Sequence, residues 1–233
     1  MKAAYRSASA VVPMIAKALQ PASVLDVGTG GGAWLRAWSD AGIRDLCGLD
    51  IAAREDSGYA VQSEFVRTDL ARPFDLGRRF SLVQSLEVAE HLPPDSAAGF
   101  VASLCRHADI VLFSAAPPGQ GGTNHFNEQP YDYWRRLFAQ HGYRPVDWLR
   151  RSLRGRRDVA WWYRYNTLIY ANDKAMGSLP APLAAAVVAD ADEIEDVATV
   201  THKLRRTILR SLPPFVIDRL AAAVDRMAIR TQR

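Results

Sequence analysis

The stretch that decides the fold is Val24-Leu25-Asp26-Val27-Gly28-Thr29-Gly30-Gly31-Gly32, near the start of the chain. Its first residues are apolar and partly β-branched, as a parallel strand buried on both faces requires. Gly28, Gly30 and Gly32 then allow a sharp turn and the close approach of a ligand. Residues 33–38 continue at helical spacing. Strand, turn and helix together predict a nucleotide-type ligand on a doubly wound α/β sheet.

The acidic residue at the end of this strand narrows the choice of ligand. A dinucleotide fingerprint has the spacing G-x-G-x-x-G and receives a pyrophosphate at the helix N-terminus, whereas here the spacing is Asp26-x-Gly28-x-Gly30-x-Gly32. A carboxylate at Asp26 would repel a pyrophosphate, but it suits a ligand with an ammonium group. The stretch resembles motif I of the class I S-adenosylmethionine (SAM) methyltransferases, in which the glycine loop passes under the amino-acid end of the cofactor.

Composition sets the broad class of protein. A length of 233 residues suits one domain with an appendage, and 48% hydrophobic residues are enough for a core. No apolar run approaches the ~18 residues of a membrane span, and the start lacks the pattern of a secretory signal. The two cysteines form no C-x-x-C pair, which predicts a reduced, cytoplasmic protein. A net charge of +4 is mildly basic and decides nothing by itself.

The resemblance implies a doubly wound, mostly parallel seven-stranded sheet over residues 1–172. Apolar runs predict strands at 24–27, 46–49, 64–67, 80–85 and 110–114. Helical spacing and proline positions predict helices at 8–20, 33–38, 94–107 and 131–141. The segment 143–149 completes a sixth unit, and 149–157 is a basic, hairpin-like connection. The aromatic-rich, alternating segment 158–170 is interpreted as the last strand, antiparallel to its neighbours as in this family.

Residues 173–233 differ in composition and are predicted to form a linker and a helical C-terminal extension. Residues 177–182 have the composition of a linker. The acidic segment 184–200 and the basic segment 203–233 are helix-prone, and Pro213-Pro214 divides the second of them. An apolar helical face there most often packs on the domain or on a second subunit, so a homodimer is one hypothesis. Contact with a membrane surface is the less favoured alternative.

The residues predicted to bind the cofactor follow the first four strands. Asp50 ends the second strand and is placed to accept hydrogen bonds from ribose hydroxyls. The resemblance implies that Asp69 binds the adenine amino group and that Leu70 contacts the ring, although Asp69 could also be a turn residue. The same resemblance implies that a glutamate after strand four closes the pocket. The full predicted set is Asp26, Gly28, Gly30, Gly32, Asp50, Asp69, Leu70 and Glu87.

The sequence Glu87-x-x-Glu90-His91 follows the fourth predicted strand, at the edge where this fold binds its substrate. His91 titrates near neutral pH and could take the proton that a hydroxyl loses during methylation, with Glu90 and His125 beside it. The pattern is also similar to the E-x-x-E-H motif of ubiquinone-pathway O-methyltransferases and small-RNA 2′-O-methyltransferases. That likeness implies Mg²⁺ or Mn²⁺ held by Glu87, Glu90, His91 and His125. A purely structural role is the third alternative.

The loop after the fifth strand carries the sequence H-x-N-E-Q-P-x-x-Y-W at residues 125–134. It resembles a subset of class I methyltransferases found with bacterial glycan and natural-product pathways. Polar groups on a long loop above a scaffold often have a function, although this loop could simply cap the helix that begins at Pro130. The predicted substrate contacts are His125, Asn127 and Glu128, which suit a polyhydroxylated acceptor, and Tyr131 and Trp134, which suit an apolar wall.

These features predict a SAM-dependent methyltransferase that acts on a hydroxyl of a small molecule, such as a sugar or a glycosylated natural product. One alternative is an RNA ribose O-methyltransferase. It is disfavoured because basic and aromatic residues are interleaved only over residues 149–162. A SAM-binding protein without catalytic activity is the alternative from another class.

Overall fold

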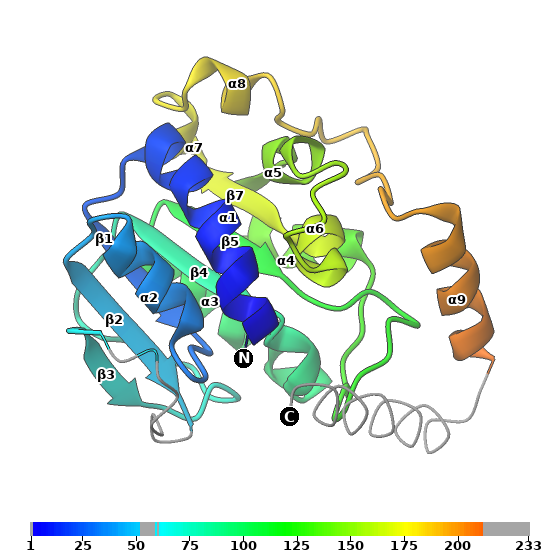
Figure 1. Cartoon of the computed structure of the whole chain (residues 1–233), viewed down its shortest axis with the longest axis horizontal. Coiled ribbons are helices and arrows are strands. Elements are labelled where there is room, and N and C mark those ends of the chain that lie inside the picture. The colour runs from blue at the N-terminus through cyan, green and yellow to red at the C-terminus, as the bar shows by residue number, and fades with distance from the viewer. Residues whose placement is uncertain (1, 52–58, 60, 212–233) are drawn as a thin grey trace.

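The computed structural model describes residues 2–51, 59 and 61–211. At its centre is a seven-stranded sheet in the order β3-β2-β1-β4-β5-β7-β6 (Figure 1). In chain order the strands are β1 Ser23–Val27, β2 Asp45–Asp50, β3 Glu64–Arg67, β4 Leu82–Leu86, β5 Ile110–Ser114, β6 Tyr143–Val146 and β7 Leu168–Asn172. Strand β7 is antiparallel to both neighbours, and the other pairs are parallel. The predicted mostly parallel α/β sheet is therefore confirmed.

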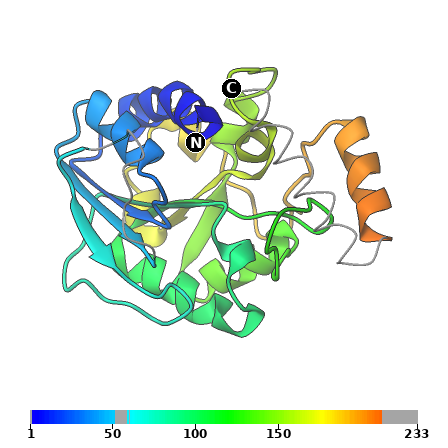
Figure 2. The same cartoon turned by 60° about the horizontal axis from the view of Figure 1, so that its bottom comes forward.

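Helices cover both faces of this sheet, as the doubly wound prediction requires. Figure 2 shows α1 and α2 on one side of the strands and α3 and α4 on the other. The helices are α1 Lys2–Leu19, α2 Ala33–Asp40, α3 Ala97–His107, α4 Tyr131–Ala139, α5 Trp148–Ser152, α6 Trp161–Asn166, α7 Asp173–Met176, α8 Ala181–Ala184 and α9 Val200–Arg210. Two short 3₁₀ turns, η1 Ala89–His91 and η2 Pro94–Ser96, lie between β4 and α3.

Alternating side chains of the central strands divide the hydrophobic core into two layers. In β1, Val24 packs on the face covered by α1 and α2, and Leu25 packs on the face covered by α3 and α4. Leu82 and Val83 of β4 repeat this alternation, because successive residues of a strand point to opposite faces. Both faces are buried, and every residue of β1 and β4 is buried.

The prediction of one strand over residues 158–170 is wrong. Residues 161–166 form the helix α6, and β7 begins only at Leu168. Aromatic residues favour strands, but a helix places residues three apart on one face. This brings both Tyr163 and Asn166 inward, where Tyr163 packs edge-on against Trp34. The prediction of a hairpin-like connection over residues 149–157 is also wrong for residues 149–152, because they belong to the helix α5.

The prediction of a helix over residues 184–200 is wrong as well. Only the end of α8 and the first residue of α9 are helical there. Val187 instead forms a β-bridge with Val146, which extends the edge of the sheet. Arg135 of α4 donates hydrogen bonds to the carbonyl oxygens of Ala189 and Asp192. These tertiary contacts outweigh the local helix propensity.

The N-terminal helix and the C-terminal extension also differ in extent from the predictions. Helix α1 begins at Lys2 instead of residue 8. The described residues after β7 pack on the sheet domain, and the predicted helical extension is present as α9. On α9, Val200, Leu204 and Ile208 form an exposed apolar stripe. Contact with a second subunit or a membrane surface stays a prediction, and residues 212–233 lie outside the described residues.

No helix in the described part of the chain is long and apolar enough to span a membrane.

Candidate functional site

The glycine turn after β1 is fixed to the end of the neighbouring strand β2. The backbone N–H groups of Gly28 and Thr29 both donate to the carbonyl oxygen of Leu49, at 2.8 and 3.0 Å. The N–H of Gly30 donates to Asp50 Oδ2 at 2.7 Å. Gly28 has φ +82°, and a Cβ there would lie 2.3 Å from Cγ2 of Val88. Only glycine therefore fits this position beside β4.

Asp26 lies beneath this turn, and its side chain is buried. Its Oδ2 accepts a hydrogen bond from the Thr29 hydroxyl at 2.8 Å, and its Oδ1 accepts one from Gln84 Nε2 at 2.9 Å. Gln84 Oε1 in turn accepts from Trp38 Nε1 of α2 at 2.7 Å. The Asp26 carboxylate thus orients the turn and ties it to α2 and β4. Its predicted attraction for a ligand's ammonium group stays a prediction.

A pocket of about 440 Å³ opens at the carboxyl ends of β1, β2 and β4. Parallel α/β sheets bind their ligands at this edge. The pocket brings together six predicted site residues from separate parts of the sequence, namely Gly28, Asp50, Asp69, Leu70, Glu87 and His91. The other three predicted cofactor residues, Asp26, Gly30 and Gly32, do not line it. We take this pocket as the candidate cofactor site.

Asp69 lies in a turn at the edge of the pocket, and its predicted contact with adenine stays a prediction. Its Oδ1 accepts a hydrogen bond from the N–H of Ala71 at 3.1 Å, which is a local turn interaction. Its Oδ2 lies 3.4 Å from Nε of Arg72. The residue also lines the pocket, next to the buried Leu70. The turn holds the Asp69 carboxylate at the pocket edge.

Glu87 is held at the back of the pocket by amides from distant segments. Its backbone has φ +56°, in the left-handed region, and its N–H donates to both the carbonyl and the hydroxyl oxygen of Ser114. Asn166 Nδ2 donates to Glu87 Oε1 at 3.1 Å, and Gln120 Nε2 donates to Oε2 at 2.8 Å. Burial raises the pKa of Glu87, and these hydrogen bonds oppose the shift in part.

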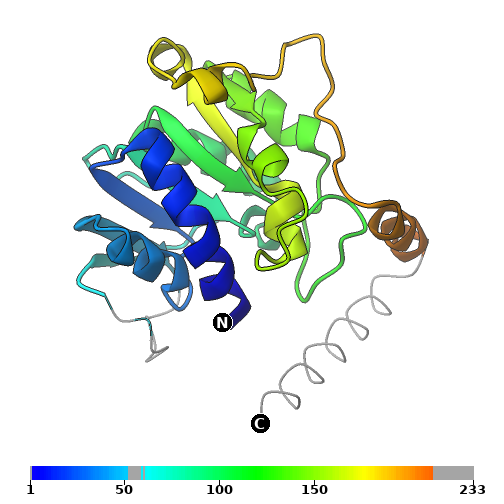
Figure 3. The same ribbon diagram turned by 45° about the horizontal axis from the view of Figure 1, so that its top comes forward.

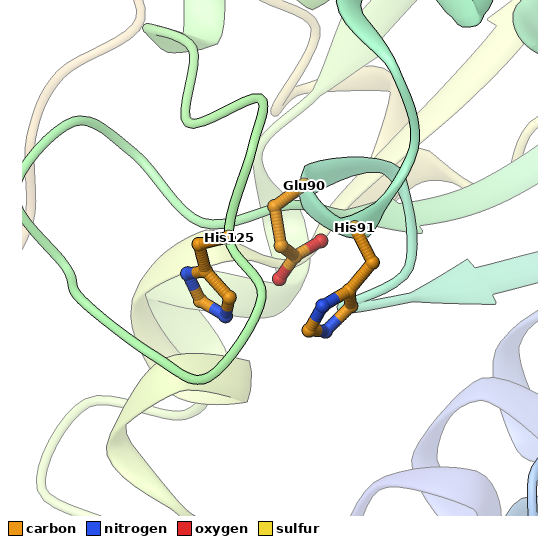
Figure 4. Close-up of side chains that lie close together, drawn as sticks. All are labelled: Glu90, His91 and His125. Carbon is orange, nitrogen blue, oxygen red and sulfur yellow. The ribbon is translucent and has the colours of Figure 1, made fainter. Parts of the chain in front are cut away.

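Beside Glu87, the side chains of Glu90, His91 and His125 converge (Figure 4). One ligand atom from each lies within 4.8 Å of the other two. The imidazole rings of His91 and His125 have centroids 4.9 Å apart and stand edge to face at 83°. Glu87 was predicted as a fourth metal ligand, but the structure places its oxygens on Asn166 and Gln120 instead.

The hydrogen bonds of the two histidines fix which ring nitrogen carries the proton. His91 Nδ1 lies 3.1 Å from the carbonyl oxygen of Asn124, and His125 Nδ1 lies 2.8 Å from Glu128 Oε1. A carbonyl and a carboxylate only accept, so each neutral ring carries its proton on Nδ1 and keeps its lone pair on Nε2. Burial and the neighbouring His125 lower the pKa of His91. The neutral, basic form of His91 is thereby favoured.

Glu128 organises the loop that presents His125. Besides His125, its carboxylate accepts hydrogen bonds from the N–H groups of Gly119 and Gly121, both at 2.7 Å. A Cβ at Gly122 would lie 2.3 Å from His125 Nε2, so the ring occupies the space that a side chain at residue 122 would need. Glu128, predicted as a substrate contact, thus serves at least to position His125.

Glu90 is fully buried, at 0% exposure. Neither of its carboxylate oxygens has a hydrogen-bond partner among residues 2–51, 59 and 61–211. Burial raises its pKa well above the ordinary value and the charge of Glu87 adds to the shift, whereas the backbone amides of Glu90 and Ala116 oppose it in part. The Glu90 backbone carbonyl accepts from Phe126 and Asn127, which docks the loop on η1. A buried carboxyl beside two imidazole rings can hold a proton or a cation.

Three predicted substrate contacts are placed in the interior. Trp134 is 2% exposed and packs against Phe113 in the core. The Tyr131 hydroxyl donates to Asn166 Oδ1 at 3.1 Å, and Asn127 is buried against η1. The aromatic residues turn inward because α4 packs on β5. None of the three lines the pocket at β1, β2 and β4.

Three other residues belong to the site although the sequence analysis did not select them. Gln120 and Asn166 hold Glu87, but they lie 33 and 79 residues from it, and no motif connects them. Phe126, next to His125, is 66% exposed. Phe126 lies within the stretch 125–134 that the sequence analysis selected, but only the structure shows that its ring is exposed.

Comparison with known families gives one match. A family model described as "Methyltransferase domain" matches residues 2–162. No curated protein sequence matches the chain.

Solved structures share the fold at low sequence identity. Streptomyces venezuelae DesVI is 14% identical, with 73% of this chain and 92% of that one covered and a TM-score of 0.53. Magnesium protoporphyrin IX methyltransferase (ChlM) from Synechocystis PCC 6803, with bound SAM, is 20% identical, with coverages of 73% and 80% and a TM-score of 0.53. SAM-bound CalS10, an amino pentose methyltransferase from Micromonospora echinaspora, is 16% identical, with coverages of 72% and 91% and a TM-score of 0.54.

Proposed function

Since the chain belongs to the family of methyltransferase domains, we propose that it transfers the methyl group of SAM to a hydroxyl of a small, polyhydroxylated acceptor such as a sugar or a glycosylated natural product. One observation carries the proposal: His91 lines the same pocket as Gly28, Asp50 and Asp69. Its contact with the carbonyl oxygen of Asn124 uses Nδ1, so the lone pair of Nε2 is not engaged in that contact. A base and a candidate cofactor site are therefore contiguous.

The pocket residues suit the parts of SAM in a definite order. The turn at Gly28 would lie under its amino-acid end, Asp50 would accept hydrogen bonds from the ribose, and Asp69 with Leu70 would meet the adenine. When bound, SAM supplies an electrophilic methyl group. The remaining requirement falls on the protein, which must orient the acceptor oxygen and remove its proton.

His91 is the group that we propose as the general base. Because its pKa is lowered by burial and by His125, the ring is neutral near pH 7. As the acceptor oxygen takes the methyl group and S-adenosylhomocysteine leaves, the hydroxyl proton would pass to Nε2 of His91, and the ring would become an imidazolium. The buried carboxyl of Glu90 beside it can balance this charge. His125 and Phe126, on the loop that Glu128 holds, are placed to contact the acceptor.

A divalent cation at Glu90, His91 and His125 is the second candidate, and the orphaned Glu90 carboxyl favours it. Both imidazoles have their Nδ1 atoms held by an acceptor, as in many protein metal sites. With Glu87 outside the cluster, the donor set is two nitrogens and one carboxylate. That set suits Mn²⁺ better than Mg²⁺. Such an ion would orient acceptor hydroxyls.

The first experiment measures S-adenosylhomocysteine formation with hydroxylated sugars, their amino-sugar counterparts and short RNAs. Methylation of the hydroxylated compounds is the expected result. Methylation restricted to amines or to RNA ribose would overturn the proposed acceptor class. SAM binding without turnover of any compound would support the alternative of a non-catalytic SAM-binding protein.

The second experiment separates the two mechanisms. With a metal-free base, His91→Ala should lower kcat by about 10²–10⁴, and a chelator should have no effect. With a cation, the chelator should abolish activity, and loss of Glu90, His91 or His125 should be similarly severe because ligands act as a unit. His141→Ala, at an exposed histidine, is the matched control. Activity that survives both chelation and His91→Ala would contradict both mechanisms.

A further inference from the structure

A second pocket, of about 530 Å³, lies between α5, the turn after it, α6 and residues 195–199. Figure 3 shows the segment after α8 passing these helices on its way to α9. Four arginines line the pocket, namely Arg150, Arg151, Arg154 and Arg164, and Glu195 is the one acidic residue of the described lining. Such a concentration of guanidinium groups attracts anions.

The arginines of this pocket have few acidic partners. Asp147 is already engaged by Arg150, whose Nε and Nη2 each lie 2.7 Å from one of its oxygens. Arg151 lies 3.9 Å from the same carboxylate, with its side chain 66% exposed. Within the described residues, Arg154 and Arg164 form no ion pair. Two acids thus face four arginines, and the pocket keeps an excess of positive charge.

Arg164 supplies a second, independent observation. Its Nη1 donates to the carbonyl oxygen of Arg156 at 3.0 Å, and its guanidinium stacks 5.1 Å from the centroid of the Tyr165 ring. Its Nε is buried and has no hydrogen-bond partner in the described part of the chain. A buried, charged N–H group without an acceptor is costly. Among the described residues no acid balances the positive charge of this guanidinium.

The arginine pocket is adjacent to the reaction centre through α6. Tyr165 lines the pocket, and its backbone carbonyl accepts a hydrogen bond from Arg150 at 3.3 Å. The next residue, Asn166, donates to Glu87 at the back of the cofactor pocket. The arginine pocket and the cofactor pocket therefore share α6 as a common wall.

We propose that this pocket binds a phosphate or diphosphate group carried by the acceptor. Arginine forks match phosphate oxygens in geometry as well as charge. The left-handed turn at Gly155, φ +79°, lines the pocket, and nothing lies within 4 Å of where its Cβ would be, which leaves room for the group. The assignment of the phosphate group to the acceptor rests on the proposed methyl transfer. The anion site itself does not depend on it.

Calorimetric titration of the full chain with pyrophosphate tests the anion site directly. Arg154→Gln and Arg164→Gln should each weaken pyrophosphate binding by about 10- to 100-fold. Arg44→Gln, at an exposed arginine before β2, changes the net charge equally and should leave the affinity unchanged. Equal weakening in all three variants, or no weakening in the pocket variants, would overturn the site. Retained SAM binding in each variant shows that it is folded.

The source of the phosphate is tested by competition. If the acceptor carries the group, pyrophosphate should raise the KM for the acceptor without changing SAM affinity, and Arg154→Gln should raise that KM with kcat little changed. A phosphorylated sugar should then be a better acceptor than its unphosphorylated form. Pyrophosphate that binds without competing would overturn the assignment to the acceptor. Failure of SAM to bind at all would instead defeat the proposed function.

Discussion

Replacing Glu90 by methionine should stabilise the protein in the absence of a cation. Glu90 is a fully buried carboxyl whose two oxygens have no hydrogen-bond partner among the described residues. Methionine has a similar length, no charge and a flexible side chain that fits irregular space. The substitution therefore removes the cost of burying an unpaired charge, while it leaves the packing of η1 largely intact.

The magnitude follows from what such burial costs. Exchanging buried ionic groups for apolar residues of similar volume is often neutral or stabilising by about 1–4 kcal/mol. We expect the same range for Glu90→Met. For a chain of this length, each kcal/mol shifts Tm by about 2–4 °C. Glu193→Met removes an exposed glutamate of the same charge, and it should leave Tm nearly unchanged.

The gain should depend on pH in a defined direction. Burial raises the pKa of Glu90 in the folded protein, whereas the unfolded chain keeps the ordinary value of about 4.3. Below that value both states are protonated, and Glu90 costs no stability by ionisation. As the pH rises, the unfolded state ionises first, so the wild type loses stability until its folded-state pKa is passed. The difference between Glu90→Met and the wild type should widen over this window and then level off.

Denaturant unfolding of the three proteins from about pH 4 to pH 8 measures this difference. A gap that stays constant with pH would refute the reasoning, because Glu90 would then not ionise differently in the two states. A variant that is less stable than the wild type by more than about 1 kcal/mol would also refute the reasoning, because the carboxyl that it lacks would then have made stabilising hydrogen bonds. Added Mn²⁺ should raise the wild-type Tm, and not that of Glu90→Met, if the cluster binds a cation.

Two further predictions concern the candidate cofactor pocket. Asp50→Ala should weaken SAM binding by about 1.5–3 kcal/mol, the range for hydrogen bonds to a charged group, and unchanged affinity by calorimetry would remove Asp50 from the ribose. Asp69→Ala should reduce both SAM affinity and the preference for adenine over other bases in competing nucleosides. If both survive in Asp69→Ala, the residue serves only its turn with Ala71.

The features that were predicted correctly depend on short, contiguous stretches of the sequence. The buried strand with its glycine turn is local, and its acid, Asp26, binds Thr29 only three residues away. The other four parallel strands are short runs with apolar residues at their centres, so their positions could be predicted from the sequence. Parallel strands end at one edge, which places Asp50 at this pocket, and the family resemblance adds Asp69; both residues line it.

The errors arise where distant contacts override local preference. Aromatic residues between 158 and 170 suit a strand equally well, but the helix α6 is selected because Tyr163 and Asn166 must both face inward. The acidic stretch around residue 190 is helix-prone, yet its carbonyl groups are bound by Arg135, more than 50 residues away. Neither partner is adjacent in sequence, so composition alone favours the wrong element.

The arrangement of Glu87, Glu90 and His91 shows why motif spacing does not settle a ligand set. The sequence places the three on one short turn, but the Glu87 carboxylate binds two amides and does not belong to the cluster of Glu90, His91 and His125. Glu87 is held by Gln120 and Asn166, which come from segments that only the fold brings near. The residues of the motif therefore have two different sets of contacts. Glu87 connects the candidate cofactor pocket to α6, while Glu90 and His91 cluster with His125.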